Sequence, residues 1–302
     1  MRDLTNLAAS IKARLRNRRR KTGESFDHLL TRFAIERLLY RLSRSSHADS
    51  FILKGAMLFR LWEEAPHRPT RDLDLLGFGT DEAARLQGIF AELCALEVEP
   101  DGLDFRPESV TSEPIREGSR YHGQRVKLLA LLERTRVDLQ VDIGFGDAVT
   151  PTPEWADFPS LLGFPAPHLR AYRRETVVAE KLHALVEHGL ASSRVKDLVD
   201  LWHLACHAAF EGGILSDAIA ATFRRRGTPL PAEPPALTSA FIDSPLQQQL
   251  WQGFLTRTEM AESPPPLSEV IAVLADFLLP AMAAAAGERS FACSWEPGGP
   301  WR

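Results

Sequence analysis

The sequence predicts an α/β (α+β) protein in which a small mixed sheet flanked by helices is followed by a C-terminal helical domain. Two observations carry this prediction. Between residues 70 and 143, stretches of alternating polar and apolar residues have the period of half-buried strands. Beyond residue 175, apolar residues recur at three- and four-residue spacing, which is the period of amphipathic helices.

The composition is that of a globular protein, with 44% hydrophobic and 25% charged residues. The basic segment 11–21 has no apolar stretch behind it, unlike a signal peptide. No apolar run is long enough to suggest a bilayer span. The three cysteines, Cys94, Cys206 and Cys293, have neither metal-type nor disulfide spacing, which fits a reducing compartment. We therefore expect a cytoplasmic protein with no membrane partner.

The charge is unevenly distributed along the chain. Residues 1–44 contain twelve Lys or Arg and four acidic residues, a net charge of +8, whereas the whole chain carries −4. A basic arm on an acidic body is typical of proteins that contact a phosphate backbone, and it is equally typical of a solvated helix face.

The N-terminal part is expected to alternate helices with strands. Pro66 and Pro69 end one helical stretch, and Thr80 or Asp81 can cap a later helix. The expected elements are helices over 4–21 and 25–45, a short apolar run at 51–53, a helix over 57–62, a strand over 70–76, a helix over 81–96 and an extended region over 104–121.

Two further strands are expected over 125–131 and 136–143, joined by a turn at Glu133-Arg134. In the second strand the apolar residues share one face, and Asp138, Gln140 and Asp142 share the other. Asp72 and Asp74 likewise lie on one face of the strand over 70–76. If these two strands pair, Asp142 becomes a third carboxylate beside Asp72 and Asp74.

Closely spaced carboxylates supply the oxygen ligands that Mg²⁺ requires, and a pair of such ions can clamp the oxygens of a phosphoryl transfer. The pattern fits metal-dependent chemistry on phosphates, and an isolated Asp-x-Asp is more often a solvated strand face that happens to be acidic. His203 and His207 lie four residues apart, which would put both on one face of a helix. Leu204 stands where a zinc protease motif has Glu, so the pair is not predicted to be a zinc site.

A proline-rich connector, with five prolines between residues 151 and 167, separates this region from a helical one. Helices are expected over 175–187, 195–209 and 267–279, with a less regular helical region over 214–260. Pro280 should kink or end the last of them, 283–286 can continue as a short helix, and the tail 288–302 is expected to be irregular and docked. The expected domains are 1–48, basic helices; 49–150, the sheet core; and 151–302, the helical domain.

Two segments give a family resemblance. Phe51-Ile-Leu-Lys-Gly-Ala-Met-Leu58, followed by Arg68-Pro-Thr-Arg-Asp-Leu-Asp-Leu75, resembles the opening motif of the nucleotidyltransferase superfamily. Val178-Ala-Glu-Lys-Leu-His-Ala-Leu185 and Arg194-Val-Lys-Asp-Leu-Val-Asp-Leu-Trp202 resemble the Lys and Asp segments of the AbiEii/AbiGii toxin family, which includes the MenT-like toxins. The resemblance runs from about residue 50 to 206.

The resemblance implies a nucleotidyltransferase-type sheet and a set of site residues. Asp72, Asp74 and Asp142 would be catalytic acids that hold Mg²⁺ or Mn²⁺, with Asp142 as third ligand or proton acceptor. The turn at Gly55 would bring backbone N–H groups to an NTP. The remaining implied residues are Lys181 as a triphosphate cation, Asp197 at the mouth of the site, and Lys54, Arg71, Arg194 and Lys196 as phosphate contacts. Ala56 stands where many members have Ser.

The resemblance also implies a function, with Lys181 and Asp197 supplied by the helical domain across a cleft. The protein would transfer NMP from an NTP to the 3′ end of tRNA and block translation, as the toxin of a toxin–antitoxin pair whose antitoxin is encoded nearby. The alternatives are a nucleotidyltransferase that modifies a small molecule or a protein, and a degenerate binding module without activity.

Overall fold

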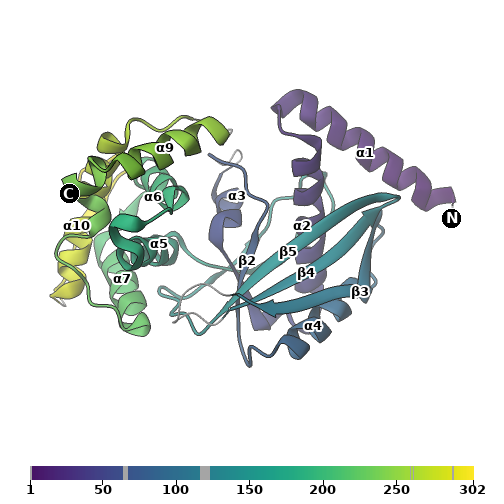
Figure 1. Ribbon diagram of the computed structural model, residues 1–302. Helices are drawn as coiled ribbons and strands as arrows, with labels where there is room; N and C mark the ends of the chain where they lie inside the picture. The colour runs from purple at the N-terminus through teal and green to yellow at the C-terminus, as the bar shows by residue number, and fades with distance from the viewer. Residues whose placement is uncertain (1, 64–66, 116–122, 259, 261, 288) are drawn as a thin grey trace. The chain divides into compact units, whose positions relative to one another are not determined.

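The computed structural model describes residues 2–63, 67–115, 123–258, 260, 262–287 and 289–302. The chain forms two compact units (Figure 1). The first consists of Met1–Glu64, Thr70–Gly146 and Glu154–Ala171; the second consists of Ala65–Pro69, Asp147–Pro153 and Tyr172–Arg302. The three-part division expected from the sequence stays a prediction.

The first unit is built on a seven-stranded mixed sheet in the order β3-β4-β5-β2-β1-β7-β6. β2 pairs parallel with β5 and antiparallel with β1, β1 pairs parallel with β7, and the other neighbours are antiparallel. The strands are β1 (Phe51–Lys54), β2 (Leu73–Gly77), β3 (Leu103–Pro114), β4 (Gly123–Leu132), β5 (Thr135–Phe145), β6 (Glu154–Asp157) and β7 (His168–Ala171).

One face of this sheet is apolar and carries the helices of the first unit. Val126, Val141 and Leu73 lie side by side across β4, β5 and β2 and are almost fully buried. Helix α4 packs Phe90 against Phe51 of β1, with ring centroids 6.0 Å apart. The other face carries the polar residues, because successive side chains of a strand point to opposite faces. The helices of this unit are α1 (Arg2–Thr22), α2 (Phe26–Arg44), α3 (Phe59–Trp62) and α4 (Ala83–Ala95).

Helix α2 is buried on all sides, so its charged residues need partners. Asp101 accepts hydrogen bonds from Arg37 Nε at 3.1 Å and from Arg41 Nη1 at 2.6 Å, and the side chains of Arg37 and Asp101 are at most 1% exposed. Glu36 accepts bonds from the Leu161 N–H and the Ser160 hydroxyl. Burial raises the pKa of Glu36, and these two hydrogen bonds oppose the rise. These contacts tie α2 to the start of β3 and to the segment before β7.

The second unit is helical. Its small sheet pairs β8 with β9 in antiparallel fashion, and Trp295 of β9 donates a hydrogen bond from Nε1 to the Ala205 carbonyl at 2.7 Å. The elements are α5 (Arg174–His188), α6 (Val195–His207), β8 (Phe210–Glu211), α7 (Gly212–Arg226), α8 (Ser239–Ile242), α9 (Pro245–Arg257), α10 (Leu267–Ala286) and β9 (Ser294–Trp295); short 3₁₀ turns also occur in both units.

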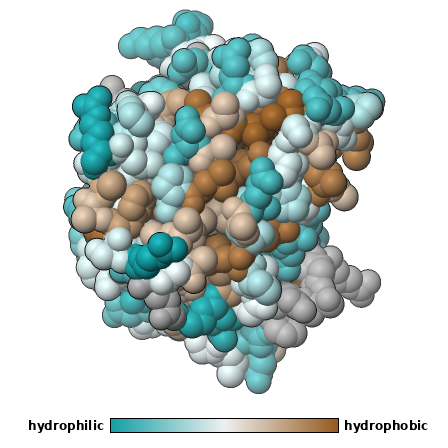
Figure 2. Space-filling model, turned by 90° about the vertical axis from the view of Figure 1, so that its left-hand side faces the viewer, coloured by the Kyte–Doolittle hydropathy of each residue, from teal (hydrophilic) through white to brown (hydrophobic). Residues whose placement is uncertain are grey.

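Helix α10 is long and apolar enough to cross a membrane by length and composition, which the sequence analysis did not anticipate. One such helix is weak support for a span, because the core helix of a globular protein passes the same test. Leu274, Phe277 and Leu278 are fully buried in the second unit, as a core helix requires. Its exposed positions are mixed in polarity and include Glu269, Asp276 and Pro280. Figure 2 shows a face of the molecule on which apolar and polar surface alternate.

Most of the expected elements are present, including the hairpin, in which Leu132 pairs with Thr135. Two details were wrong. The strand expected from Thr70 begins at Leu73, and α4 is capped by Glu82 without a side-chain bond. Helix α10 runs from Leu267 to Ala286 with Pro280 inside it, so Pro280 does not end the helix; Pro280 is exposed, and the carbonyl it leaves unbonded can face water. The tail contains β9, and residues 116–122 of the expected extended region lie outside the described residues.

Asp101→Asn should lower the free energy of unfolding by about 3 kcal/mol, because it removes the carboxylate charge to which two buried guanidinium groups are hydrogen-bonded. Urea denaturation followed by circular dichroism measures this. The matched control is Asp138→Asn, which removes a carboxylate from an exposed pair with Arg136 and should cost about 0.5 kcal/mol or less. Equal losses for the two variants would contradict a structural role for the buried network.

Candidate functional site

The register of the sheet places a row of charged residues on its polar face. Lys54 of β1 stands opposite Asp74 of β2, Asp74 opposite Asp142 of β5, and Asp142 opposite Arg125 of β4. Residues that are directly opposite in neighbouring strands point to the same face. The pairing that the sequence left open therefore exists, and it brings two of the three predicted acids together.

The turn after β1 approaches Asp74 closely. Gly55 has a positive φ of 72°, which is a left-handed conformation that favours glycine. A Cβ placed on Gly55 would overlap the Asp74 carboxylate, whose Cγ would be only 2.7 Å away. Glycine is therefore required here both by the backbone angle and by the space that the Asp74 side chain occupies. Ala56 follows in the same 3₁₀ turn, Gly55–Leu58.

Asp142 is held by its neighbours on the sheet. Arg125 donates from Nε to Oδ1 at 2.8 Å and from Nη2 to Oδ2 at 2.7 Å, and Gln140 Nε2 lies 3.3 Å from Oδ1. The side chain of Asp142 is 22% exposed and that of Arg125 is 32% exposed, so solvent and ligands can reach the pair. A cation that binds Asp142 must compete with Arg125.

Asp72 and Arg71 lie just before β2 and are exposed. Asp72 is therefore not a strand residue, and its carboxylate is placed by the segment that enters β2. The Asp72 N–H is 3.4 Å from the Thr70 hydroxyl, a weak local bond. The first unit thus gathers Lys54, Gly55, Asp74 and Asp142, and Asp72 lies in the segment that enters β2.

Lys181 and Asp197 come together in the second unit. Lys181 Nζ, on α5, donates to Asp197 Oδ1 on α6 at 2.6 Å, and it also lies 2.7 Å from Asp200 Oδ2. Arg194, the N-cap residue of α6, has Nη1 3.6 Å from Asp197 Oδ2, and Lys196 is exposed. Lys181 is therefore a cation already paired with two carboxylates.

Asp200 is the centre of this group and is fully buried. Arg68 donates to it from Nε at 2.6 Å and from Nη2 at 2.7 Å, and His67 Nε2 is 2.8 Å from its Oδ1. Burial alone would raise the pKa of Asp200, but the charges of Lys181 and Arg68 hold it well below its ordinary value. Burial likewise opposes the charge of Lys181, yet Asp197 and Asp200 raise its pKa.

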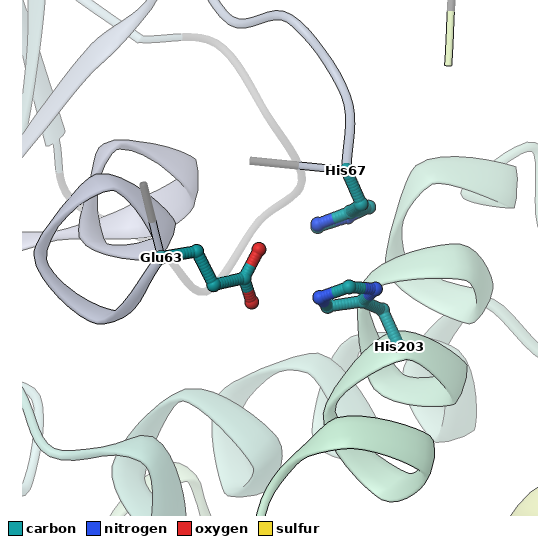
Figure 3. Close-up of side chains that lie close together, drawn as sticks. All are labelled: Glu63, His67 and His203. Atoms are coloured by element: carbon teal, nitrogen blue, oxygen red, sulfur yellow. The ribbon is translucent and has the colours of Figure 1, made fainter. Parts of the chain in front are cut away.

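A column of imidazole rings lies beside Asp200. His67 stacks on His203 with ring centroids 4.1 Å apart and planes at 16°, as Figure 3 shows, and His203 stacks on His207 at 4.3 Å. Burial lowers the pKa of His67, so its ring is neutral at pH 7 despite the hydrogen bond with Asp200. Figure 3 also labels Glu63, which belongs to the first unit.

Arg125 and Asp200 were missed by the sequence reasoning. Counting back from the predicted Glu133-Arg134 turn pairs Arg125 with Asp142. The register of the predicted hairpin could therefore have identified Arg125. Asp200 follows Asp197 by three residues, which is one helical turn, among buried apolar positions. Its partners Arg68 and His67, distant in sequence, gave no such signal.

Gly55→Ala should destabilise the protein by more than strain alone. Gly163 is the matched control, because its φ of 71° is nearly the same and its Cβ would meet nothing within 4 Å. Gly163→Ala should cost about 1 kcal/mol for the left-handed backbone. Thermal denaturation should show a larger loss for Gly55→Ala, and part of it should return in the Gly55→Ala/Asp74→Ala double variant. An equal loss at both glycines would show that the Asp74 carboxylate is not crowded.

Asp200→Asn should lower the free energy of unfolding by about 3 kcal/mol, since it leaves Lys181 and Arg68 short of a counter-charge in a buried place. Asp217→Asn, at an exposed position of α7, is the control. The folded-state pKa of Asp200 is depressed, so its contribution is full above the unfolded value of about 3.9 and disappears only as the pH falls through the folded value. Denaturation at pH 5 and pH 8 should therefore give the same difference; a difference that vanishes at pH 5 would contradict the assignment.

Comparisons with known proteins bear on the fold and the family of the chain. No curated protein matches the chain. A solved structure, JHP933 from Helicobacter pylori, has a TM-score of 0.50 and 14% identity, and covers 87% of this chain and 94% of its own. Another H. pylori structure, described provisionally as a nucleotidyltransferase, has a TM-score of 0.49 and 14% identity over 88% of this chain and 97% of its own. At this identity the likeness concerns the fold alone.

A family model described as "Nucleotidyl transferase AbiEii toxin, Type IV TA system" matches residues 37–273, which is most of the chain. The matched region contains the acids on the sheet and the Lys181–Asp197–Asp200 group. The chain therefore belongs to the AbiEii family of nucleotidyl transferase toxins.

Proposed function

We propose that this toxin transfers NMP from an NTP to the 3′ end of tRNA in a divalent-metal-dependent reaction, and thereby blocks translation. The observation that carries the proposal is the Asp74 carboxylate, which stands opposite Asp142 and against the Gly55 turn. Family membership supplies the reaction class. The metal, the acceptor and the residue roles are our inference.

The donor atoms fit a hard divalent cation. Asp72, Asp74 and Asp142 offer carboxylate oxygens, which are the ligands that Mg²⁺ and Mn²⁺ take. When bound, such a cation would neutralise charge on the triphosphate. The acids differ in their surroundings, because Asp142 is already engaged by Arg125 and Gln140. Asp74 and Asp72 are therefore the primary ligands in this proposal, and Asp142 is a third ligand or the acceptor of the proton from the attacking hydroxyl.

The turn that follows β1 binds the triphosphate in this proposal. Because Gly55 has no Cβ, the backbone can come close to a ligand, and N–H groups can donate to phosphate oxygens. Ala56 has no hydroxyl to contribute, so these backbone groups carry the contact. Lys54 stands opposite Asp74 on the neighbouring strand, and Arg71 precedes Asp74 by three residues in the chain, so both are candidate cations for the phosphates.

Roles for the second unit follow from its charges. Lys181 shares its charge with Asp197 and Asp200, so a phosphate that approached it would have to compete with both carboxylates. We infer that Asp200 positions Lys181 and that Asp197 is its exchangeable partner, since Asp197 is 14% exposed and Asp200 is fully buried. Arg194 and Lys196 are candidate contacts for substrate phosphates at the solvent side of α6.

The acceptor proposal rests on the resemblance to the toxin family and on the basic segment 1–44, which has a net charge of +8. The partner expected from a toxin–antitoxin system is an antitoxin that limits the activity. Co-expression of the neighbouring gene should then relieve growth arrest caused by this protein.

The test incubates the purified protein with total tRNA, Mg²⁺ and each α-³²P-labelled NTP in turn. Label should reach tRNA from at least one NTP, and Asp74→Ala should reduce it by on the order of 100-fold or more, because the metal and the triphosphate lose their central ligand. Asp138→Ala is the matched control, since it removes an exposed carboxylate from the same strand as Asp142. It should keep near-normal activity.

Different outcomes point to different substrates. Label on a protein or a small molecule, with none on tRNA, would refute the tRNA acceptor and retain the transferase. Absence of transfer from every NTP to every acceptor would favour a binding module without activity. Transfer that persists in chelator would contradict the metal.

A further inference from the structure

A second cluster of charges lies in the first unit, around the connection between α1 and α2. Glu24 is the acid that lies within 4 Å of its basic side chains. His28 Nε2 lies 3.7 Å, Arg32 Nη1 3.9 Å and Arg60 Nη2 3.6 Å from the Glu24 carboxylate oxygens. These residues come from the start of α2 and from α3, the short helix that follows the Gly55 turn.

The basic side chains of this cluster are buried, but they are not saturated with hydrogen bonds. The side chains of His28, Arg32 and Arg60 are each 7% exposed. Within the part of the chain that the structure describes, Nε of Arg32, Nε2 of His28 and Nε of Arg18 are buried without a hydrogen-bond partner. Buried polar groups are normally bonded, so these nitrogens have hydrogen-bonding capacity that a ligand can use.

The charges around Glu24 are out of balance. Arg32 and Arg60 share the Glu24 carboxylate, Glu36 acts on Arg32 more weakly, and the charge of Arg18 acts on both arginines. Burial and the charge of Arg60 lower the pKa of Arg32 to about 10, and burial lowers the pKa of His28, with further lowering by Arg60, Arg71 and Arg32. Like charges held together in a buried place favour the arrival of an anion.

The geometry of Glu24 is that of a loosely held counter-ion. Its three ion-pair distances all exceed the roughly 2.8 Å of a strong charge-assisted hydrogen bond. Its side chain is 26% exposed, so the cluster is open to solvent at this point. It also precedes Ser25, the N-cap of the 19-residue helix α2, whose N-terminus favours negative charge. A phosphate has more acceptor oxygens than a carboxylate and can bond to several of these donors at once.

Most of this cluster lies outside the family match. Arg18, Glu24, His28 and Arg32 precede residue 37, where the match begins. They are also not part of the row of charges at Asp74 and Asp142. The cluster is therefore a feature of this chain that the toxin assignment leaves unexplained.

We propose that Arg18, His28, Arg32 and Arg60 form a binding site for a phosphate group, with Glu24 as the internal counter-ion that the phosphate displaces. The phosphate comes from the backbone of a polynucleotide or from the tail of a nucleotide, which present the same chemistry. The site does not depend on the proposed transfer reaction, because its test measures binding alone.

The experiment measures affinity in EDTA, at fixed ionic strength, for three probes: inorganic phosphate, ATP, and a single-stranded RNA without terminal phosphates. Glu24→Gln should bind at least one probe about fivefold more tightly, because it removes the competing carboxylate. Arg32→Gln should bind the same probe about tenfold more weakly, as expected for the loss of a charge-assisted bond. With RNA, Arg32→Gln should also reduce the salt dependence of binding by about one phosphate contact.

Two controls keep the test sharp. Glu133→Gln removes the same charge from an ion pair with Lys12 of α1 and should leave all three affinities unchanged. Arg32→Lys keeps the charge but lacks the guanidinium group. If Arg32→Gln fails to fold, Arg32→Lys is measured instead and should bind the same probe more weakly than the unchanged protein. Thermal denaturation provides a second readout, because Glu24→Gln should lose stability in chloride and regain it in phosphate.

The source of the phosphate follows from which probe responds. A response to RNA assigns the site to a polynucleotide backbone, and a response to ATP alone assigns it to a nucleotide. Unchanged affinities for all three probes in Glu24→Gln and Arg32→Gln, with no rescue by phosphate, would overturn the proposal and leave the cluster a structural ion pair group.

Discussion

The register of β2 between β1 and β5 is the constraint on which the acid site depends. It puts Asp74 between Lys54 and Asp142 on one face, while Leu73 and Leu75 face the core. A slip of one residue would bury Asp74 and expose the leucines, so the hydrophobic effect itself fixes the position of the carboxylate. Position 55 has no room for a side chain, because the Asp74 carboxylate fills the space beside the turn.

The two units manage buried charge in different ways. In the second, Lys181 and Arg68 are matched by Asp197 and Asp200, and the pKa of Asp200 is held well below its ordinary value, so the group is a neutral and firmly bonded unit. Burying such a group has a large desolvation cost, and removing one of its charges leaves another buried charge uncompensated. A ligand that uses Lys181 has to exchange partners with it.

In the first unit the balance is different at each end of α2. Near the C-terminal half, the buried Asp101 accepts hydrogen bonds from Arg37 Nε at 3.1 Å and from Arg41 Nη1 at 2.6 Å. Near the N-terminus, Arg32 Nη1 lies 3.9 Å from Glu24, whose side chain is 26% exposed. The contrast within one helix is one of distance and access, because a carboxylate that is hydrogen-bonded and buried is harder for a ligand to displace than one that is more distant and open to solvent.

The sequence by itself determined the local structure: the 2.0 and 3.6 periodicities predicted the hairpin, α5 and α6, because side-chain direction along one element follows from spacing alone. The motif around Asp72 and Asp74 and the family resemblance came from the sequence as well. The tertiary structure alone decided that β2 lies parallel to β5, and that Arg68 and His67 close on Asp200. It also decided that Glu24 is shared by cations from α2 and α3. Those contacts join segments far apart in the chain, and no local period encodes which of them will meet.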